Sequence, residues 1–229
     1  MRIPSNFAWN IAQEEKARRE GERKKARAAR STGAHTTMPI KDPRMVQKWL
    51  AIAREHDARR VRGGVSWYML LLLGFNTGLR IGDICTLRVG DVRGRERVRV
   101  IAEKTDKMTD IKLQEPVRRA IDAALKNSSP EDFALLSRQK NRKNGASRPI
   151  SRQRCYAIVK EIAARAGFTE HVGCHTLRKT FAWNFYQADG DLAKLQKVLN
   201  HSSQEATIHY LGLDQLAVDQ AIDKMITMA

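Results

Sequence analysis

The 229-residue sequence is 42% hydrophobic and 29% charged, enough to bury the core of one good-sized domain, or of one domain and an arm. Its formal net charge of +17 predicts a polyanionic partner: DNA, RNA or an anionic membrane surface. There is no apolar run of transmembrane length, the first residues lack the apolar core of a signal peptide, and three widely spaced cysteines favour a reducing cytoplasm over a disulfide framework.

Residues 1–40 form the first distinct segment. The stretch is rich in Arg, Lys and Ala and has few apolar side chains with which a helix could pack. Two interpretations stay open. It is a basic arm that orders on nucleic acid through residues such as Arg23, Lys24 and Lys25, or it is a disordered solubilising tail.

Beyond a boundary at 38–44, the periodicity of apolar residues predicts a mostly helical domain. Ser151 reads as an N-cap, and the apolar run 68–75 as a buried helix. The predicted helices cover residues 45–53, 65–75, 81–87, 116–127, a segment after Ser151, 175–188, 191–199 and a segment after 204.

Two short segments predict a hairpin early in the domain. Residues 97–104 alternate with a period of two, and a second short strand is expected around 110–113 after a polar turn. A basic, Gly- and Pro-punctuated loop follows at 138–149. The predicted fold class is therefore mainly α with a small antiparallel β-sheet.

Five short segments carry candidate chemistry. Each alone fits a surface or packing role, which is the usual one for these residue types. The segments are TGLRIGD (77–83), EKTDK (103–107), HTLRKT (175–180), LNHSS (199–203) and ATIHY (206–210).

In this order the segments resemble the catalytic domain of the tyrosine recombinase (phage integrase) family, over about residues 41–229. The pattern is Arg in a TGLR turn, Lys on a hairpin, H-x-x-R, then L-x-H and a Tyr nine positions later. The resemblance implies the tyrosine-recombinase catalytic-domain fold for 41–229, with residues 1–40 as an arm. It also implies a site-specific DNA recombinase, of integrase, excisionase or invertase type, acting through a covalent 3′-phosphotyrosine.

The residue types suit this chemistry. A phosphodiester attacked by a hydroxyl passes through a transition state with added negative charge, which the always-charged guanidiniums of Arg80 and Arg178 can stabilise. Tyr210 is the candidate nucleophile, and its phenol needs help to lose a proton at neutral pH. Because His175 lies three residues before Arg178, both share one helical face.

The resemblance assigns the remaining roles. His175 accepts the phenol proton or positions the phosphate, and His201 donates to a nonbridging oxygen. Lys104 matches the family lysine that protonates the leaving oxygen, with Lys107 as its rival. Asp83 either orients a guanidinium or histidine or is a plain surface carboxylate. The chemistry needs no cofactor, and Cys174 beside His175 lacks a second pair at metal-ligand spacing, so we expect no metal.

Two departures from the family pattern stand out. Asn200 occupies the position before His201 where the family usually has Gly, although Asn tolerates a left-handed backbone. Residues 1–40 are too few for the core-binding domain that the family usually has before this one, so we expect an organisation similar to single-domain members that resemble the fimbrial-switch invertases. At the other end, residues 213–229 have apolar side chains near one helical face. This tail docks on an adjacent protomer, as is frequent in the family, or folds back on its own domain.

The expected partner is double-stranded DNA with specific recombination sites, bound by a dimer on each site and a tetramer in synapsis, with accessory proteins and without a membrane. The expected location is cytoplasmic and nucleoid-associated. The alternatives are a type IB topoisomerase-like enzyme, a catalytically silent DNA-binding accessory protein, and a basic RNA-binding protein. Besides the arm residues, the candidate DNA contacts are Arg138, Lys140, Arg142, Lys143, Arg148 and Lys179.

Overall fold

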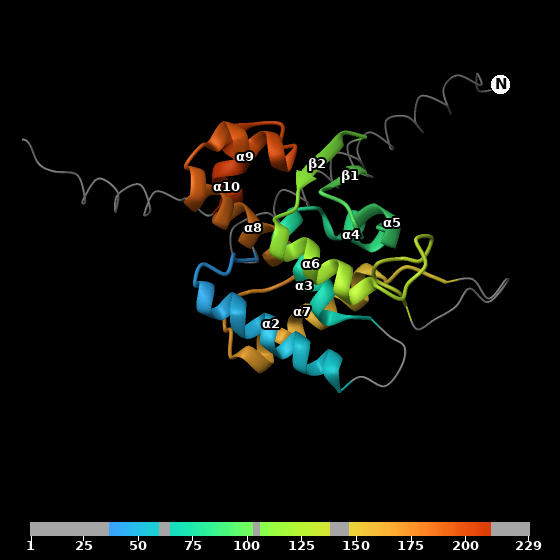
Figure 1. Ribbon diagram of the computed structural model, residues 1–229. Helices are drawn as coiled ribbons and strands as arrows, with labels where there is room; N and C mark the ends of the chain where they lie inside the picture. Colours follow the sequence, from blue (N-terminus) through green and yellow to red (C-terminus); the bar gives the residue numbers. More distant parts are fainter. Residues whose placement is uncertain (1–36, 60–64, 103–105, 138–146, 212–229) are drawn as a thin grey trace, which may run out of the picture. The chain divides into compact units, whose positions relative to one another are not determined.

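The computed structural model describes residues 37–59, 65–102, 106–137 and 147–211 (Figure 1). The described part is mostly helical with one small sheet, as the sequence predicted. Its elements are α2 (Pro43–Ala58), α3 (Trp67–Thr77), α4 (Ile81–Thr86), α5 (Val89–Val92), β1 (Arg97–Ile101), β2 (Met108–Lys112), α6 (Glu115–Leu125), α7 (Arg152–Ala166), α8 (Cys174–Asp189), α9 (Leu192–Leu199) and α10 (Gln204–Leu211).

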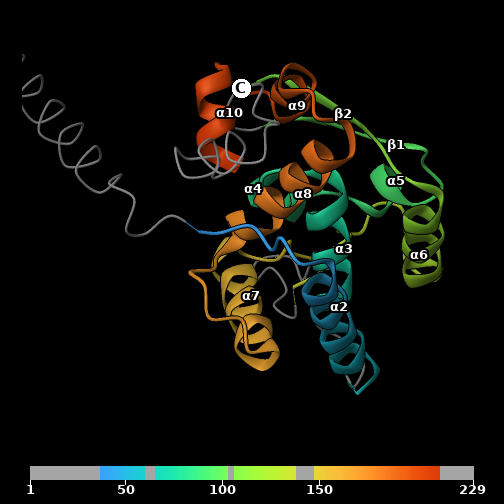
Figure 2. The same cartoon turned by 90° about the vertical axis from the view of Figure 1, so that its left-hand side faces the viewer.

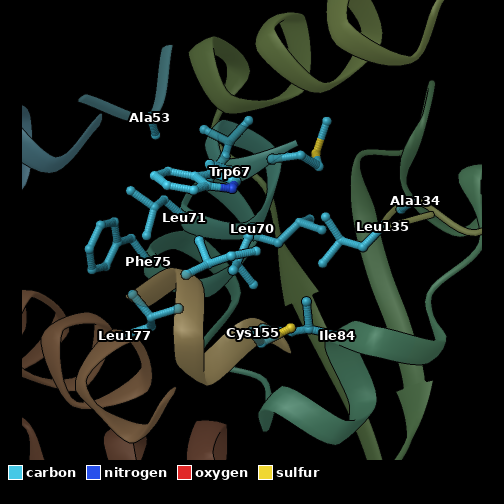
Figure 3. Close-up of a cluster of buried hydrophobic side chains, with 14 of the residues drawn as sticks. Ala53, Trp67, Leu70, Leu71, Phe75, Ile84, Ala134, Leu135, Cys155 and Leu177 are labelled. Carbon is cyan, nitrogen blue, oxygen red and sulfur yellow. The ribbon is translucent and has the colours of Figure 1, made fainter. Parts of the chain in front are cut away.

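The helix α3 lies at the centre of the large core. Nearly all of its side chains are buried, because its sequence is apolar on every face and α2, α4, α6 and α8 all pack against it. Figure 3 shows Leu70, Leu71 and Phe75 in this cluster, with Leu177 contributed by α8. This confirms the predicted buried helix, which begins and ends two residues later than the predicted 65–75.

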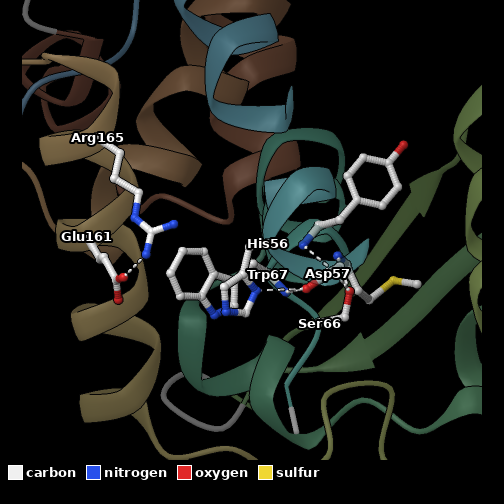
Figure 4. A network of polar contacts seen from close by, with 8 residues as sticks. His56, Asp57, Ser66, Trp67, Glu161 and Arg165 are labelled. Carbon is white, nitrogen blue, oxygen red and sulfur yellow. Dashed lines mark hydrogen bonds and ion pairs between the residues drawn. The ribbon is translucent and has the colours of Figure 1, made fainter. Parts of the chain in front are cut away.

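The start of α3 is fixed by a polar network at the end of α2 (Figure 4). The Asp57 carboxylate accepts hydrogen bonds from the Ser66 hydroxyl at 2.5 Å and from the backbone N–H of Trp67 at 3.1 Å. Ser66 in turn caps the helix by accepting from Met69 N–H at 3.0 Å. The His56 ring stacks on Trp67 with centroids 3.6 Å apart. These contacts satisfy N–H groups that a helix start leaves without partners, so they position α3 along its axis.

The sheet is a two-stranded antiparallel hairpin, with Arg97 opposite Lys112 and Ile101 opposite Met108. Inward-facing side chains of the hairpin are buried, whereas Arg97 points outward and binds the Asp110 carboxylate at 2.7 Å. The first strand ends at Ile101, earlier than the predicted 104, and the second begins at 108, earlier than the predicted 110.

A second, smaller hydrophobic cluster lies under α9 and α10. It contains Ala182 from α8, Leu195 and Leu199 from α9, and Leu211 from α10, with partly buried aromatic rings around them. Figures 1 and 2 show α9 and α10 beside the later part of α8, away from α2 and α7. Among the described residues, no helix combines the length and the apolar character needed to cross a membrane.

Several local predictions can be compared directly with the structure. Ser151 caps α7 by accepting from Arg154 N–H at 3.1 Å, which confirms the predicted N-cap. The helix α5 was not predicted, because its four residues are too few to show a period. Residues 1–36 and 212–229, which include nearly all of the predicted arm and tail, lie outside the described residues.

Candidate active site

The turn after α3 begins the site. Gly78 ends α3 in the left-handed conformation, with φ of 60°, and a Cβ there would stand 2.3 Å from Cδ1 of Phe181. Glycine is therefore required both by the backbone and by the close approach of the ring. Two residues later Arg80 is the N-cap of α4, which places its side chain at the exit of this turn.

Arg178 connects this turn to the end of α9. Its side chain is 6% exposed; Nη1 donates to the Gly78 carbonyl at 2.5 Å and Nη2 to the Leu199 carbonyl at 2.7 Å. A guanidinium has five N–H donors, so these two bonds do not exhaust it. Burial lowers the pKa of Arg178. The positive charge of Arg80 acts in the same direction and the buried Asp83 carboxylate opposes it, so both residues lie close to this guanidinium.

The turn that carries His201 is held at three points. Asn200 ends α9 in the left-handed region, with φ of 52°, as expected for an Asn in place of the family Gly. The His201 N–H donates to the Gln196 carbonyl at 3.1 Å, and the His201 carbonyl accepts from Gln196 Nε2 at 3.3 Å. The Asn200 side chain also reaches the hairpin, where Nδ2 donates to the buried Thr109 hydroxyl at 2.8 Å.

The His201 ring is partly buried and lies against α10. Its Nδ1 is 3.0 Å from the hydroxyl oxygen of Thr207. Burial, with the charges of Arg178 and Arg80 as further causes, lowers the pKa of His201 to about 4. The ring is therefore neutral at neutral pH and carries a single N–H.

Tyr210 lies in contact with both His175 and His201. Its hydroxyl lies 3.4 Å from Nδ1 of His175, and its ring meets the His201 ring edge-on with centroids 5.0 Å apart. The Arg178 guanidinium stands 6.0 Å from the ring centroid and the Lys179 ammonium 5.3 Å. Burial raises the pKa of Tyr210 to about 12, although the two arginines pull it down.

The structure thus brings together most of the residues that the sequence singled out. His175, Arg178, His201 and Tyr210 converge, and Arg80 and Asp83 lie near enough to affect the charged groups among them. Asp83 is buried, not a surface carboxylate. Lys104 lies outside the described residues, and its rival Lys107 is exposed in the hairpin turn.

The predicted DNA contacts fall into three groups. Arg148 is exposed, and its carbonyl accepts from Ser137 N–H at 2.9 Å, at the base of the basic loop. Lys179 is 5% exposed, and burial lowers its pKa, so this lysine lies beneath the tyrosine ring and not on an open surface. The others are outside the described residues: Arg23, Lys24, Lys25, Arg138, Lys140, Arg142 and Lys143.

Three side chains that contact the site or the helix α4 beside it were not found from the sequence. Thr207 and the side chain of Asn200 act through contacts between elements, which no local pattern reveals. Arg152 begins α7, and its guanidinium crosses Gly82 of α4 so closely that a Cβ there would be 2.7 Å from Nη2. The glycine of RIGD, Gly82, was the one signal in the sequence that another side chain approaches α4.

Comparisons with known proteins give sequence matches to one protein family. The family model described as the phage integrase family matches residues 44–216. The chain is 39% identical over 148 residues to the probable integrase/recombinase YoeC of Bacillus subtilis, covering 65% of this chain and 78% of that protein. It is 31% identical over 144 residues to the tyrosine recombinase XerD of Corynebacterium glutamicum, covering 62% of this chain but 46% of that relative.

Solved structures show the same fold. The crystal structure of XerA recombinase matches with a TM-score of 0.64 at 21% identity, over 85% of this chain and 66% of that one. The Tn1549 transposon integrase in complex with transposon right end DNA matches with a TM-score of 0.61 at 15% identity, over 85% of this chain and 67% of that one. The present chain therefore has the fold of these structures, and its match to XerD spans about half the length of that relative.

Proposed function

This chain belongs to the phage integrase family, and from that membership we propose that it is a site-specific DNA recombinase that cuts and rejoins DNA through a covalent 3′-phosphotyrosine. One observation carries the proposal. The Tyr210 phenol from α10 lies 3.4 Å from His175 and beside the guanidinium of Arg178, both from α8. A hydroxyl nucleophile, a proton acceptor and a fixed cation are the parts that phosphoryl transfer to a side chain requires.

The reaction can be assigned to these residues step by step. The Tyr210 oxygen forms a bond to the scissile phosphorus while the bond from phosphorus to the 5′-oxygen breaks. His175 takes the phenol proton, which is necessary because burial raises the pKa of Tyr210 to about 12. Arg80 and Arg178 stabilise the added charge, and His201 donates to a nonbridging oxygen. Lys104 protonates the leaving 5′-oxygen.

Rejoining is the reverse of these steps. A 5′-hydroxyl attacks the phosphotyrosine, restores the phosphodiester and releases Tyr210. Because the covalent linkage conserves the energy of the broken bond, the proposed cycle consumes no ATP. An intact set of candidate residues also speaks for an enzyme over a silent accessory protein.

The DNA partner and the assembly are part of the same proposal. The net charge of +17 supports binding to double-stranded DNA, and the solved complex of the Tn1549 integrase with DNA supports the same partner. We propose that dimers bind single sites and pair into tetramers, joined by the apolar residues of 213–229. Removal of 213–229 should then impair assembly on paired sites more than binding to one site, measured by gel shift. Equal losses would contradict that role.

The test is covalent capture on nicked DNA. The full chain is incubated with a pool of duplexes that carry a randomised site and a nearby nick, which lets the cleaved strand escape and blocks rejoining. We expect a denaturant-resistant adduct with the wild type, none with Tyr210→Phe, and an adduct with Tyr186→Phe, which loses a phenol in the same small cluster.

Each other outcome is informative. An adduct that persists in Tyr210→Phe would contradict the choice of nucleophile. A wild-type protein that binds DNA from the pool and never becomes linked to it would contradict the enzymatic function.

A further inference from the structure

Thr207 lies between His201 and Tyr210 in the sequence, and its side chain contacts the His201 ring. It is 0% exposed, it lies in α10 three residues before Tyr210, and its hydroxyl oxygen is 3.0 Å from Nδ1 of His201. The same oxygen is 3.3 Å from the Ser203 carbonyl. Residues three apart share one face of a helix, so Thr207 and the tyrosine both face the site.

What remains to be set at His201 is the position of its proton. The backbone is already held through Gln196, and the ring is neutral because burial and the two arginines lower the pKa of His201 to about 4. A neutral imidazole has one N–H and one nitrogen that only accepts. Donation to a phosphate oxygen through Nε2 therefore requires that Nδ1 be the acceptor.

The Thr207 hydroxyl has one proton, and the group that accepts this proton determines which ring nitrogen of His201 is protonated. If the proton goes to the Ser203 carbonyl, Nδ1 must carry the ring proton, and Nε2 would then present a lone pair to an anionic phosphate. If the proton goes to Nδ1, Nε2 carries the N–H. The shorter of the two distances is the one to Nδ1, at 3.0 Å against 3.3 Å.

We propose that Thr207 is a positioning residue that donates its hydroxyl proton to Nδ1 of His201 and so keeps the ring proton on Nε2 for the scissile phosphate. The proposal rests on the proposed function, because it gives the ring a phosphate to donate to. Thr207 itself does not touch the reacting atoms. It acts through His201, and it joins the helix of the nucleophile to the orientation of the histidine.

The first test reads the tautomer directly in the full-length protein without DNA. Nitrogen NMR of histidine-labelled protein distinguishes a protonated from an unprotonated ring nitrogen, and a His201→Gln sample identifies the signals of His201. We expect an unprotonated Nδ1 and a protonated Nε2 in the wild type and in Thr207→Ser, and loss of this preference in Thr207→Val. A wild-type ring protonated on Nδ1 would overturn the proposal.

The second test measures the rate of adduct formation on nicked DNA. Thr207→Val has nearly the same shape without the hydroxyl and should be about tenfold slower, whereas Thr207→Ser should stay within about twofold of the wild type. In a His201→Gln background the Val substitution should cost less than about twofold, because its target is gone. An unchanged penalty in that background would show a structural role and refute the proposal.

These measurements separate the two hypotheses. A wild type without any adduct would contradict the recombinase function while leaving the tautomer result intact. A wild type that forms the adduct but shows the wrong tautomer would contradict the role of Thr207 alone. If Thr207→Val fails to fold, the wild-type and Thr207→Ser spectra still decide.

Discussion

In the described part of the chain, the two hydrophobic clusters differ greatly in size, and the candidate site lies between them. The large cluster surrounds α3 and includes residues from α2, α4, α6, α7 and the first part of α8. The small one, counted over residues 37–59, 65–102, 106–137 and 147–211, has four buried residues, under α9 and α10. The carbonyl of Gly78 that holds Arg178 belongs to an element of the first cluster, whereas His201 and Tyr210 belong to elements of the second.

The difference indicates which part of the site is rigid. Local opening costs least where few apolar contacts are buried, so α9 and α10 should open more readily than α3. The proposed phosphate-binding cation, Arg178, is then fixed by the main core, and the proposed nucleophile, Tyr210, is carried by the part that can adjust. Arg178 joins the two regions, since it bonds to Gly78 on one side and to Leu199 on the other.

The largest effect is expected when this junction is changed. Arg178→Lys keeps the charge but cannot reproduce the two bonds or a forked contact to phosphate, and it should slow adduct formation by about 10²–10³-fold. Arg165→Lys is the matched control. Its guanidinium lies 5.1 Å from the Trp67 ring centroid in the large region, and its replacement should leave the rate unchanged. If Arg178→Lys formed the adduct at nearly the wild-type rate, the proposed role of Arg178 in joining the two regions would be contradicted.

The unequal clusters can be tested by paired core truncations. Leu71→Ala, in the large cluster, should lower the free energy of unfolding by about 3–5 kcal/mol. Leu195→Ala, in the small one, should lower it less, by about 2–3 kcal/mol. In Leu195→Ala, amide hydrogen exchange should accelerate in α9 and α10, while the amides of α3 stay protected. Uniform acceleration through α3 would show that the clusters unfold as one unit.

A smaller effect is expected at the contact between α9 and the hairpin. Asn200→Gly keeps the left-handed turn and removes the bond to Thr109, which should cost about 1 kcal/mol of stability. Asn200→Ala loses the same bond and adds backbone strain of about 1–2 kcal/mol. Urea unfolding of the two variants gives both values. Equal free energies of unfolding for Asn200→Gly and Asn200→Ala would mean that a Cβ at residue 200 does not strain the left-handed backbone.

The last prediction concerns the pH dependence of stability. The folded pKa of His201, about 4, lies below the ordinary value of 6.5, so the unfolded chain binds more protons between these values. The contribution of His201 is fully present above pH 6.5 and is lost as the pH falls toward 4. Urea unfolding from pH 7 to pH 4 should therefore show a shallower loss of stability in His201→Gln than in the wild type. Parallel curves would contradict the low pKa.

The sequence predicted the elements well where a period was long enough to read. The helix α3 was found because an apolar run of that length has few other folded forms, and α5 was missed because four residues show no period. The candidate site residues were singled out because their types and spacing together resemble one family, and the structure brings most of the described ones together. The partners of these residues could not be found in this way. Thr207 lies in the quoted ATIHY segment, yet its contact with His201 depends on how α10 packs against the end of α9.

The raised pKa of Tyr210 affects how the protein reacts with DNA that is not its target. A protein with a net charge of +17 meets many phosphodiesters that are not its target, at every stage of its search. A phenol whose pKa is raised to about 12 is a poorer nucleophile in this state than a phenol in water. Under the proposed function, chance encounters should therefore leave such DNA uncut, so that the same burial that makes catalysis demanding also protects DNA that is not the target.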